Sequence, residues 1–264
     1  MENTSVRKDD LRAFKLKIRL LASDKIIILL VLIQAISAAI TAFLPWGNIR
    51  PDNILPDLPL WQLALINGAI VFAIYNVFGI IGNRLSLKFP FREIRKSDFN
   101  NIVLHLRPVF WGIAIGIFFI IIDQIVGRMH GKQFLPHPPF PTSLFASLSA
   151  AIGEEIIFRL FFVSILYWVF LSISRQRRNA ECFFLAAAIS AIAFSAGHLP
   201  SALYFLHIET IAEIPSHILL EIFLLNSLLS IPAAYMLKNS GLLAAVTLHL
   251  SADLVWHVGY GYFY

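Results

Sequence analysis

The sequence predicts an all-α fold, a polytopic bundle of about seven transmembrane helices, and three observations lead to this prediction. The chain has 264 residues, of which 58% are hydrophobic and only 14% charged, so it lacks the polar surface that a water-soluble domain needs. Its apolar residues form seven continuous runs, each about as long as the roughly 20 residues that cross a bilayer as a helix. These runs lack the alternation of polar and apolar residues that marks an outer-membrane barrel, which leaves a helical bundle.

The predicted spans are bounded by charged residues, proline or glycine. They lie near residues 26–45, 60–82, 108–126, 143–172, 181–198, 217–237 and 241–260. The connection between the third and fourth spans contains four prolines, and we expect it to be an extended loop. The single cysteine, Cys182, excludes a disulfide framework and a cysteine-based zinc site. The length therefore allows one transmembrane domain, residues 26–264, after a basic segment, residues 1–25.

Basic residues are distributed unequally between the two ends of the spans. With the N-terminus inside, the inner segments hold 17 Lys and Arg residues and the outer segments hold 3. The positive-inside rule then places segment 1–25 in the cytoplasm and the C-terminus outside. Cleavage of a signal peptide between Ser37 and Ala42 is an alternative, which the continuing apolar run disfavours. This asymmetry and the attraction of anionic membrane lipids explain the net charge of +5, so no nucleic-acid partner is predicted.

The fourth span contains three charged residues, Glu154, Glu155 and Arg159, in an otherwise apolar run. Each charge costs about 2.5–3.5 kcal/mol at the centre of a membrane helix, so each needs a partner or water. Glu155 and Arg159 are four residues apart with the acid first, the favourable spacing for a helical ion pair. Glu154 lies about 100° around the helix and is available for chemistry. A buried salt-bridge cluster without chemistry is the alternative for this span taken alone.

Two further spans carry ionisable residues. The fifth span ends with Phe194 and His198, and the seventh contains His249 and Asp253, whose spacing of four places both on one helical face that His257 continues. A single membrane histidine is commonly a hydrogen-bond partner between helices, but ionisable groups from three spans are harder to explain by packing. A carboxylate in a site of low dielectric constant can take a proton from water while a histidine orients that water, which is the chemistry of peptide hydrolysis.

Hydrolysis of an amide also needs hydrogen-bond donors for the developing oxyanion. His249 and a second group on its face can supply them. Asp253 can donate only when it is protonated, and otherwise it is expected to orient His249 through a hydrogen bond.

At these residues the sequence resembles the CAAX protease and bacteriocin-processing (CPBP or Abi) family, which includes the Rce1-type prenyl-protein proteases. Their pattern is E-E-x-x-x-R, F-x-x-x-H and H-x-x-x-N/D on three successive membrane helices. The matching residues, all within 145–255, are Glu154, Glu155, Arg159, Phe194, His198, His249 and Asp253.

The resemblance implies an intramembrane endopeptidase that acts on a prenylated protein or another peptide, such as a bacteriocin precursor. It implies that Glu154 is the general base that activates water with His198, and that His249 and residue 253 form the oxyanion hole. Glu155, Arg159 and Phe194 would support them. This chain has Asp253 where Rce1-like members carry Asn, and a carboxylate is a poorer donor than an amide. No cofactor is predicted.

Three alternatives stay open. Zinc is one, with His198, His249 and Glu154 as ligands by residue type, although no H-E-x-x-H spacing is present. A membrane scaffold that keeps the fold without catalysis is the second. The third is a proton-coupled transporter, which the lack of paired broken helices disfavours.

The side of access is less determined by the sequence. Glu154 lies about 18 Å from the outer start of its span, near the middle of the membrane. The place of His198 near the outer end of its span favours an outward-opening or lateral site, whereas Rce1-type relatives suggest cytoplasmic access.

The other polar residues of the spans receive structural roles. Asp123, Gln124 and Glu221 are expected to be solvated at the membrane interface. Asn67, Asn76 and Asn226 are expected to form hydrogen bonds between helices. No chemistry is assigned to four outer histidines, His130, His137, His207 and His217.

Overall fold

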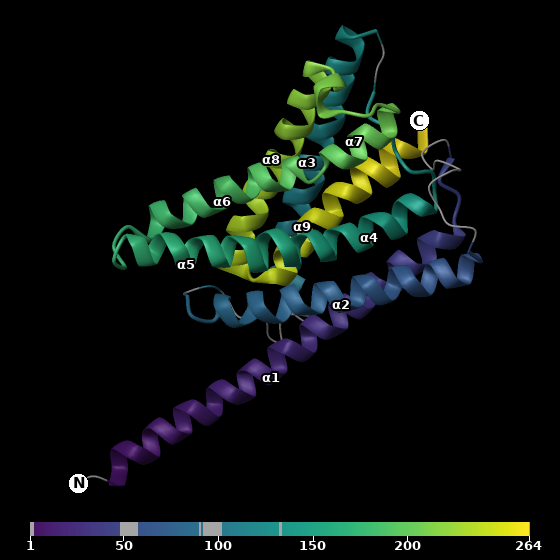
Figure 1. Ribbon diagram of the computed structural model, residues 1–264. Coiled ribbons are helices and arrows are strands. Elements are labelled where there is room, and N and C mark those ends of the chain that lie inside the picture. The colour runs from purple at the N-terminus through teal and green to yellow at the C-terminus, as the bar shows by residue number, and fades with distance from the viewer. Residues whose placement is uncertain (1–2, 48–57, 90, 92–101, 132–133, 264) are drawn as a thin grey trace.

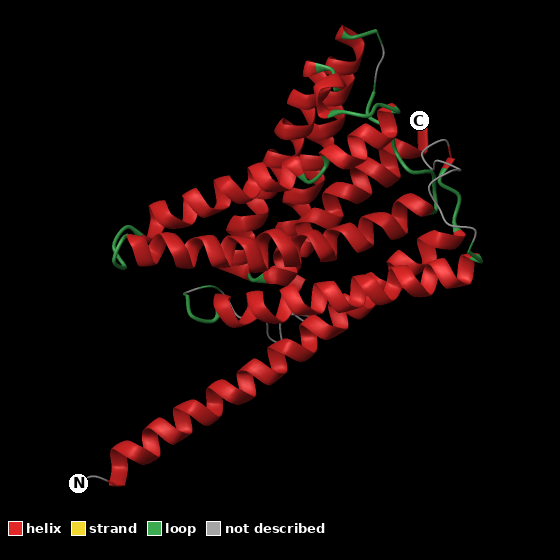
Figure 2. Cartoon of the chain, viewed as in Figure 1, coloured by secondary structure: helices red, strands yellow, loops and turns green. Residues whose placement is uncertain are grey.

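The computed structural model describes residues 3–47, 58–89, 91, 102–131 and 134–263, and all regular secondary structure within these ranges is helical (Figures 1 and 2). The described residues include seven helical spans that are long and apolar enough to cross a membrane. These spans are Ser23–Phe43, Leu60–Ser86, Leu106–Met129, Thr142–Ile173, Asn179–Leu206, Ser216–Ser240 and Leu242–Phe263. The protein is therefore an all-α, multi-pass membrane protein, which confirms the predicted fold class.

The α-helices follow the predicted spans closely, with two exceptions: α1 begins at Asn3, within the basic segment 1–25, and the fifth span continues past residue 198. The helices are α1 Asn3–Ile40, α2 Leu60–Ser86, α3 Ile102–Met129, α4 Thr142–Glu154, α5 Ser164–Ile173, α6 Asn179–Ala196, α7 Leu199–Leu206, α8 Ser216–Ser240 and α9 Leu242–Asp253. The fifth span was predicted to end at residue 198, but after a break at Gly197 and His198 it continues as α7. Pro200 lies in the first turn of α7, where its missing N–H is tolerated, so this proline does not end the span.

Two spans contain π-helical segments. The π-helix η4, Glu155–Val163, joins α4 to α5, and the π-helix η6, Leu254–Tyr260, follows α9. Such segments are rare and frequently lie at functional sites. Here η4 begins with Glu155, and Asp253 directly precedes η6.

The fourth span is central in the bundle (Figure 1). Its α4 and η4 segments contact α1 and α2 on one side, and α6, α8 and α9 on the other. Helix α3 packs against α8 and α9. The seventh span thus lies directly beside the fourth, which brings together the two spans that carry most of the ionisable residues.

Glycine permits close contact between α2 and η4. A Cβ atom at Gly82 would lie 2.8 Å from the carbonyl carbon and oxygen of Leu160 and 2.9 Å from the Cα of Phe161. Since these are backbone atoms, they cannot move aside easily, and we expect Gly82→Ala to destabilise the protein by about 1–3 kcal/mol. The unfolding midpoint in detergent measures this loss.

Gly68→Ala is the matched control on the same helix. Its new Cβ would lie 3.4 Å from the nearest atoms, the carbonyl oxygen of Ala35 and the Cβ of Ala39, so we expect little change. Equal midpoints for the two variants would contradict the close packing of α2 on η4.

The predicted amide contacts are confirmed at one position and wrong at two. Asn67 Nδ2 donates to the carbonyl of Ala38 in α1 at 2.8 Å, so it joins two helices. Asn76 and Asn226 instead donate to the carbonyl four residues earlier in their own helices. This local bond competes with a contact between helices wherever a short polar side chain can reach the preceding turn.

The expected interfacial solvation is wrong for two of three polar residues, Asp123 and Glu221. Asp123 is completely buried, and its carboxylate accepts hydrogen bonds from the Leu135 N–H at 2.9 Å and the Tyr260 hydroxyl at 2.8 Å. The neighbouring Gln124 is half-buried and donates to the same hydroxyl. Glu221 of α8 is also buried. The packing of α3 against α8 and η6 therefore buries Asp123 and Glu221 inside the bundle.

Candidate active site

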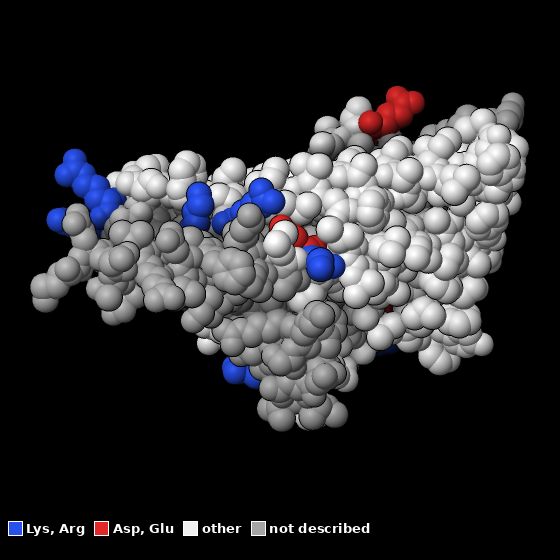
Figure 3. Space-filling model, turned by 90° about the horizontal axis from the view of Figure 1, so that it is seen from below, with Lys and Arg blue, Asp and Glu red and all other residues white. Residues whose placement is uncertain are grey.

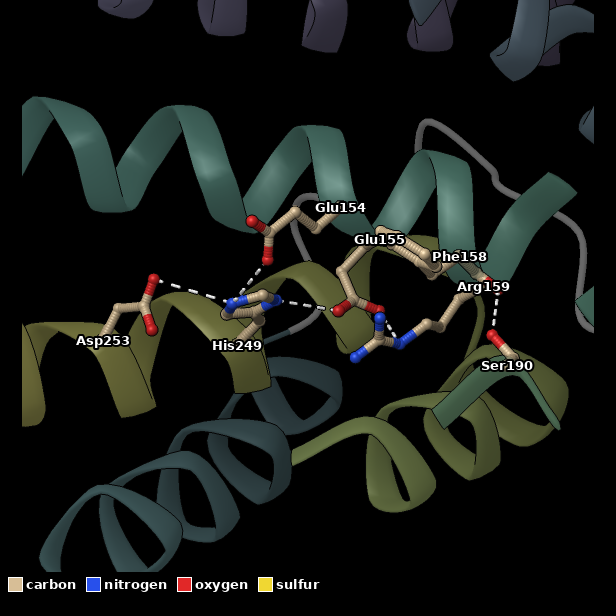
Figure 4. A network of polar contacts seen from close by, with 7 residues as sticks. All are labelled: Glu154, Glu155, Phe158, Arg159, Ser190, His249 and Asp253. Atoms are coloured by element: carbon tan, nitrogen blue, oxygen red, sulfur yellow. Dashed lines mark hydrogen bonds and ion pairs between the residues drawn. The ribbon is translucent and has the colours of Figure 1, made fainter. Parts of the chain in front are cut away.

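Four predicted site residues meet between the fourth and seventh spans (Figure 4). The imidazole of His249 lies between two carboxylates, with its Nδ1 2.8 Å from Glu155 Oε1 and its Nε2 3.6 Å from Glu154 Oε2. Asp253, one turn further along α9, places its Oδ2 3.6 Å from the same Nε2. One histidine of the seventh span thus contacts both acids of the fourth.

The contact with Glu155 determines the orientation of His249. At 2.8 Å, Nδ1 is within hydrogen-bond distance of the carboxylate and donates to it, whereas the two contacts of Nε2 at 3.6 Å are longer than hydrogen bonds. The sequence left two roles open for Asp253, an oxyanion donor when protonated or a hydrogen-bond partner that orients His249, and at 3.6 Å from Nε2 it does not form the orienting bond here. Sequence reasoning missed the role of Glu155 because Glu155 and His249 lie 94 positions apart and no pattern along one helix relates them.

The predicted ion pair between Glu155 and Arg159 is present and fully buried. Arg159 Nε lies 3.3 Å from Glu155 Oε2, and neither side chain is exposed. The guanidinium carbon also lies 4.1 Å from the centre of the Phe194 ring, a cation–π contact. Glu155 therefore joins Arg159 to His249, and Phe194 covers the other face of the guanidinium.

The π-helix η4 is anchored to the fifth span at this level. Ser190 Oγ of α6 donates to the carbonyl oxygen of Phe158 at 2.7 Å (Figure 4). In the π-helix the usual bonding pattern of carbonyl groups is altered, and this hydroxyl supplies a partner from outside the helix. The bond fixes η4, and with it Glu155 and Arg159, against α6.

A cavity of about 230 Å³ lies beside these residues. Glu154, His198, His249 and Asp253 line it, together with mainly apolar side chains from α3, α4, α8 and η6. His198 is held by its Nδ1, which lies 2.8 Å from the Phe194 carbonyl oxygen. The side chain of Glu154 is 27% exposed, compared with 8% for Asp253 and 0% for Glu155, so Glu154 is the most accessible of the three carboxylates.

The cluster contains more acids than bases. Three carboxylates, Glu154, Glu155 and Asp253, face one permanent cation, Arg159. Even a protonated His249 leaves one negative charge unbalanced. The excess negative charge favours proton uptake by one of the three carboxylates, and the most exposed of them at the cavity is Glu154.

Comparison with known protein families assigns part of the chain. Residues 136–255 match the family of type II CAAX prenyl endopeptidases described as Rce1-like. The range contains the seven motif residues named above, and it begins in the connection before the fourth span. Searches of curated proteins and of solved structures gave no match.

Zinc binding is the alternative chemistry for these residues. Among the residues that the structure describes, no three or more His, Cys, Asp or Glu side chains are placed to hold a metal ion. The alternative ligands Glu154, His198 and His249 line one cavity, and the bond from Nδ1 of His249 to Glu155 leaves Nε2 as the ring nitrogen that could bind a metal. As these three side chains are placed here, they do not form a tetrahedral zinc site.

Two histidines near the proline-rich end of the cavity were not assigned a role from the sequence. His257 of η6 lines the cavity, and its Nδ1 lies 3.1 Å from Nδ1 of His137 in the proline-rich connection. Burial lowers the pKa of His137 to about 4, so its ring is neutral at neutral pH. Their separation of 120 positions left no sequence signal for this contact.

Proposed function

We propose that the protein is an intramembrane endopeptidase that hydrolyses a peptide bond with a water molecule activated by Glu154. The match of residues 136–255 to the Rce1-like family supports peptidase activity. The single observation that carries the proposal is the position of Glu154. Its carboxylate lies at the cavity, 3.6 Å from a buried histidine that Glu155 holds in place.

The proposed reaction begins when Glu154 accepts a proton from water that His198 helps to orient in the same cavity. The water oxygen attacks the carbonyl carbon of the peptide bond, and the carbonyl oxygen becomes an oxyanion. A protonated His249, held through its Nδ1, donates from Nε2 to this oxyanion. Glu154 then gives its proton to the leaving nitrogen as the carbon–nitrogen bond breaks.

The cavity favours an apolar peptide segment. Its volume of about 230 Å³ is slightly below the roughly 300–1,000 Å³ of typical ligand sites, so it accommodates a few side chains around the reacting bond. Phe119, Leu225, Leu229 and Trp256 contribute apolar walls. Prenylated proteins and other peptide precursors in the membrane are therefore the substrate classes to test.

We further propose the membrane orientation that the positive-inside rule predicts. The N-terminus, the connection between α2 and α3 and the connection between α5 and α6 lie in the cytoplasm. The proline-rich connection before α4 and the C-terminus lie outside. The distribution of Lys and Arg along the chain supports this orientation.

A peptide panel tests the function directly. Detergent-purified protein and its Glu154→Gln variant are offered diverse peptides, including prenylated CAAX peptides, with and without a strong chelator. We expect cleavage by the wild type in the presence of chelator and none by the variant. Loss of activity with chelator that added zinc restores would support the zinc alternative.

Two outcomes would contradict the peptidase proposal. One is cleavage that does not depend on Glu154. The other is a cell carrying Glu154→Ala that behaves like the wild type while a full deletion does not, which would favour a scaffold.

Substitutions at residue 253 test whether it helps to stabilise the oxyanion. An amide has the N–H donor that an ionised carboxylate lacks, so Asp253→Asn is expected to retain or increase the rate. Asp253→Leu is expected to reduce the rate by roughly 10²–10³-fold, the usual effect of losing one oxyanion donor. The ratio of the two kcat values measures the effect, and equal rates would rule out a donor role for residue 253.

A further inference from the structure

The cavity beside Glu154 extends toward only one end of the bundle. Its outer walls are Pro136 and Pro138 of the proline-rich connection, Ser201 and Phe205 of α7, and Ile218 at the start of α8. All of these residues lie near span ends that are at the same end of the bundle as the C-terminus. In Figure 1, α7 and the C-terminus lie toward the right, and the loop between α5 and α6 lies at the left.

Toward the opposite end, the cavity is closed by the buried support of the site. Arg159 and Glu155 are completely buried, and Phe194 is 1% exposed. Residues of η4 beyond Arg159 and residues of α5 do not line the cavity. Among the described residues, the cavity therefore leads from Glu154 toward the C-terminal end of the bundle, and tightly packed side chains close it in the other direction.

The wall formed by residues 134–141, here called the outer strap, is attached to the bundle at several points. The backbone N–H of Leu135 donates to the buried Asp123, which also accepts a hydrogen bond from Tyr260. His137 contacts His257, 3.1 Å away. These contacts hold the strap against α3 and η6, and Leu135 packs against the apolar cluster of α7 and α8. The outer strap thus forms one fixed wall of the entrance to the cavity.

Charge distinguishes the two ends of the bundle. Among the residues whose side chains the structure describes, the Lys and Arg residues at the closed end are Lys25, Arg84, Lys88, Arg107, Arg175, Arg177, Arg178 and Lys238. At the open end, the described residues include Arg128 together with two acids, Glu209 and Glu213. Figure 3 shows the described Lys and Arg over the left and middle of the face drawn, and none of the coloured residues at its right end is Lys or Arg. Under the positive-inside rule, the open end lies outside the cytoplasm.

We propose that substrate reaches Glu154 from the extracytoplasmic side, through an entrance between the outer strap, α7 and the start of α8. The substrate is then a peptide segment exposed on that side of the membrane. An exported peptide is such a segment, and so is the outer juxtamembrane part of a membrane protein. The nature of the entering molecule rests on the proposed peptidase function, whereas the direction of access rests on the cavity and the charges.

The accessibility of an introduced cysteine tests this direction without requiring activity. The background is Cys182→Ser, which removes the only native cysteine. Ala150→Cys places a thiol inside the cavity, one helical turn before Glu154, and Arg177→Cys places a matched thiol on the exposed loop at the opposite end. A small, charged, membrane-impermeant methanethiosulfonate reagent is applied to right-side-out and inverted vesicles from a bacterial expression host.

We expect the Ala150→Cys thiol to react at least 10-fold faster in right-side-out vesicles, and the Arg177→Cys thiol to show the reverse preference. Ser147→Cys, also in the cavity, provides a second test if the first variant does not fold. Faster reaction of the cavity thiols in inverted vesicles would overturn the proposal. So would cavity thiols that stay unreactive in both preparations while Ser201→Cys at the entrance reacts.

A cleavage assay then connects access with function. An impermeant peptide that the detergent-purified protein cleaves is expected to be cleaved by intact right-side-out vesicles, and by inverted vesicles only after permeabilisation. The opposite latency would overturn the proposed direction. Absence of cleavage in detergent would contradict the proposed function instead, and the cysteine reactivities would still determine the direction of access.

Discussion

Replacing Glu154 by Gln is expected to slow peptide cleavage by roughly 10²–10⁴-fold, the range associated with loss of a general base. Gln has almost the same shape as Glu but cannot accept a proton from water. The side chain is 27% exposed and contacts His249 at 3.6 Å. Neutralising it does not leave a buried charge without a partner, because His249 keeps its contact with Glu155. We therefore expect kcat to fall while the unfolding midpoint in detergent stays close to that of the wild type.

Glu181→Gln provides a matched control for this prediction. Glu181 is an exposed carboxylate in the first turn of α6, far from the cavity residues along the fifth span, and its neutralisation should leave kcat unchanged. A Glu154→Gln variant that retains more than a tenth of the wild-type rate would show that another group activates the water. A variant that loses both rate and folding would show that Glu154 is structural.

The fold and the ionisable residues of the candidate site could be predicted from the sequence because both depend on patterns within one span. Apolar runs of membrane length revealed the seven spans. Charges in an apolar run are costly, so Glu154, Glu155 and Arg159 were conspicuous, and the helical period paired the last two correctly.

Contacts between spans could not be predicted in the same way. The bond between Glu155 and His249 joins residues 94 positions apart, and that between Asp123 and Tyr260 joins residues 137 apart. Their existence depends on how the helices rotate and approach each other, which no periodicity within one helix determines. The continuation of the fifth span past His198 was missed for another reason: proline marks a span boundary in the prediction, whereas Pro200 lies in the first turn of α7.

The geometry places two neighbouring acids in different environments. Glu154 ends α4 and reaches the cavity, whereas Glu155 begins the π-helix η4 and points into the packed interior. Glu155 accepts a hydrogen bond from His249 with one oxygen and contacts Arg159 with the other. We infer that the buried acid positions His249, and that the exposed acid is left to react.

Arg159→Met is the second variant with a large expected effect, and this effect is on stability. Methionine keeps an unbranched side chain against Phe194 but removes the cation that lies 3.3 Å from Glu155. Because both side chains are completely buried, the remaining carboxylate would be an uncompensated charge, which typically costs about 3–5 kcal/mol. We expect a corresponding loss in denaturant unfolding of the detergent-purified protein.

The double variant Glu155→Gln with Arg159→Met separates charge balance from packing. It removes both charges, and the amide oxygen of Gln can still accept the hydrogen bond from His249 Nδ1. Replacement of a buried ion pair by neutral groups of similar volume is often tolerated, so we expect the double variant to recover at least half of the stability lost by Arg159→Met. A double variant less stable than either single variant would instead mean that the shape of the guanidinium stabilises this part of the bundle, and that its charge does not.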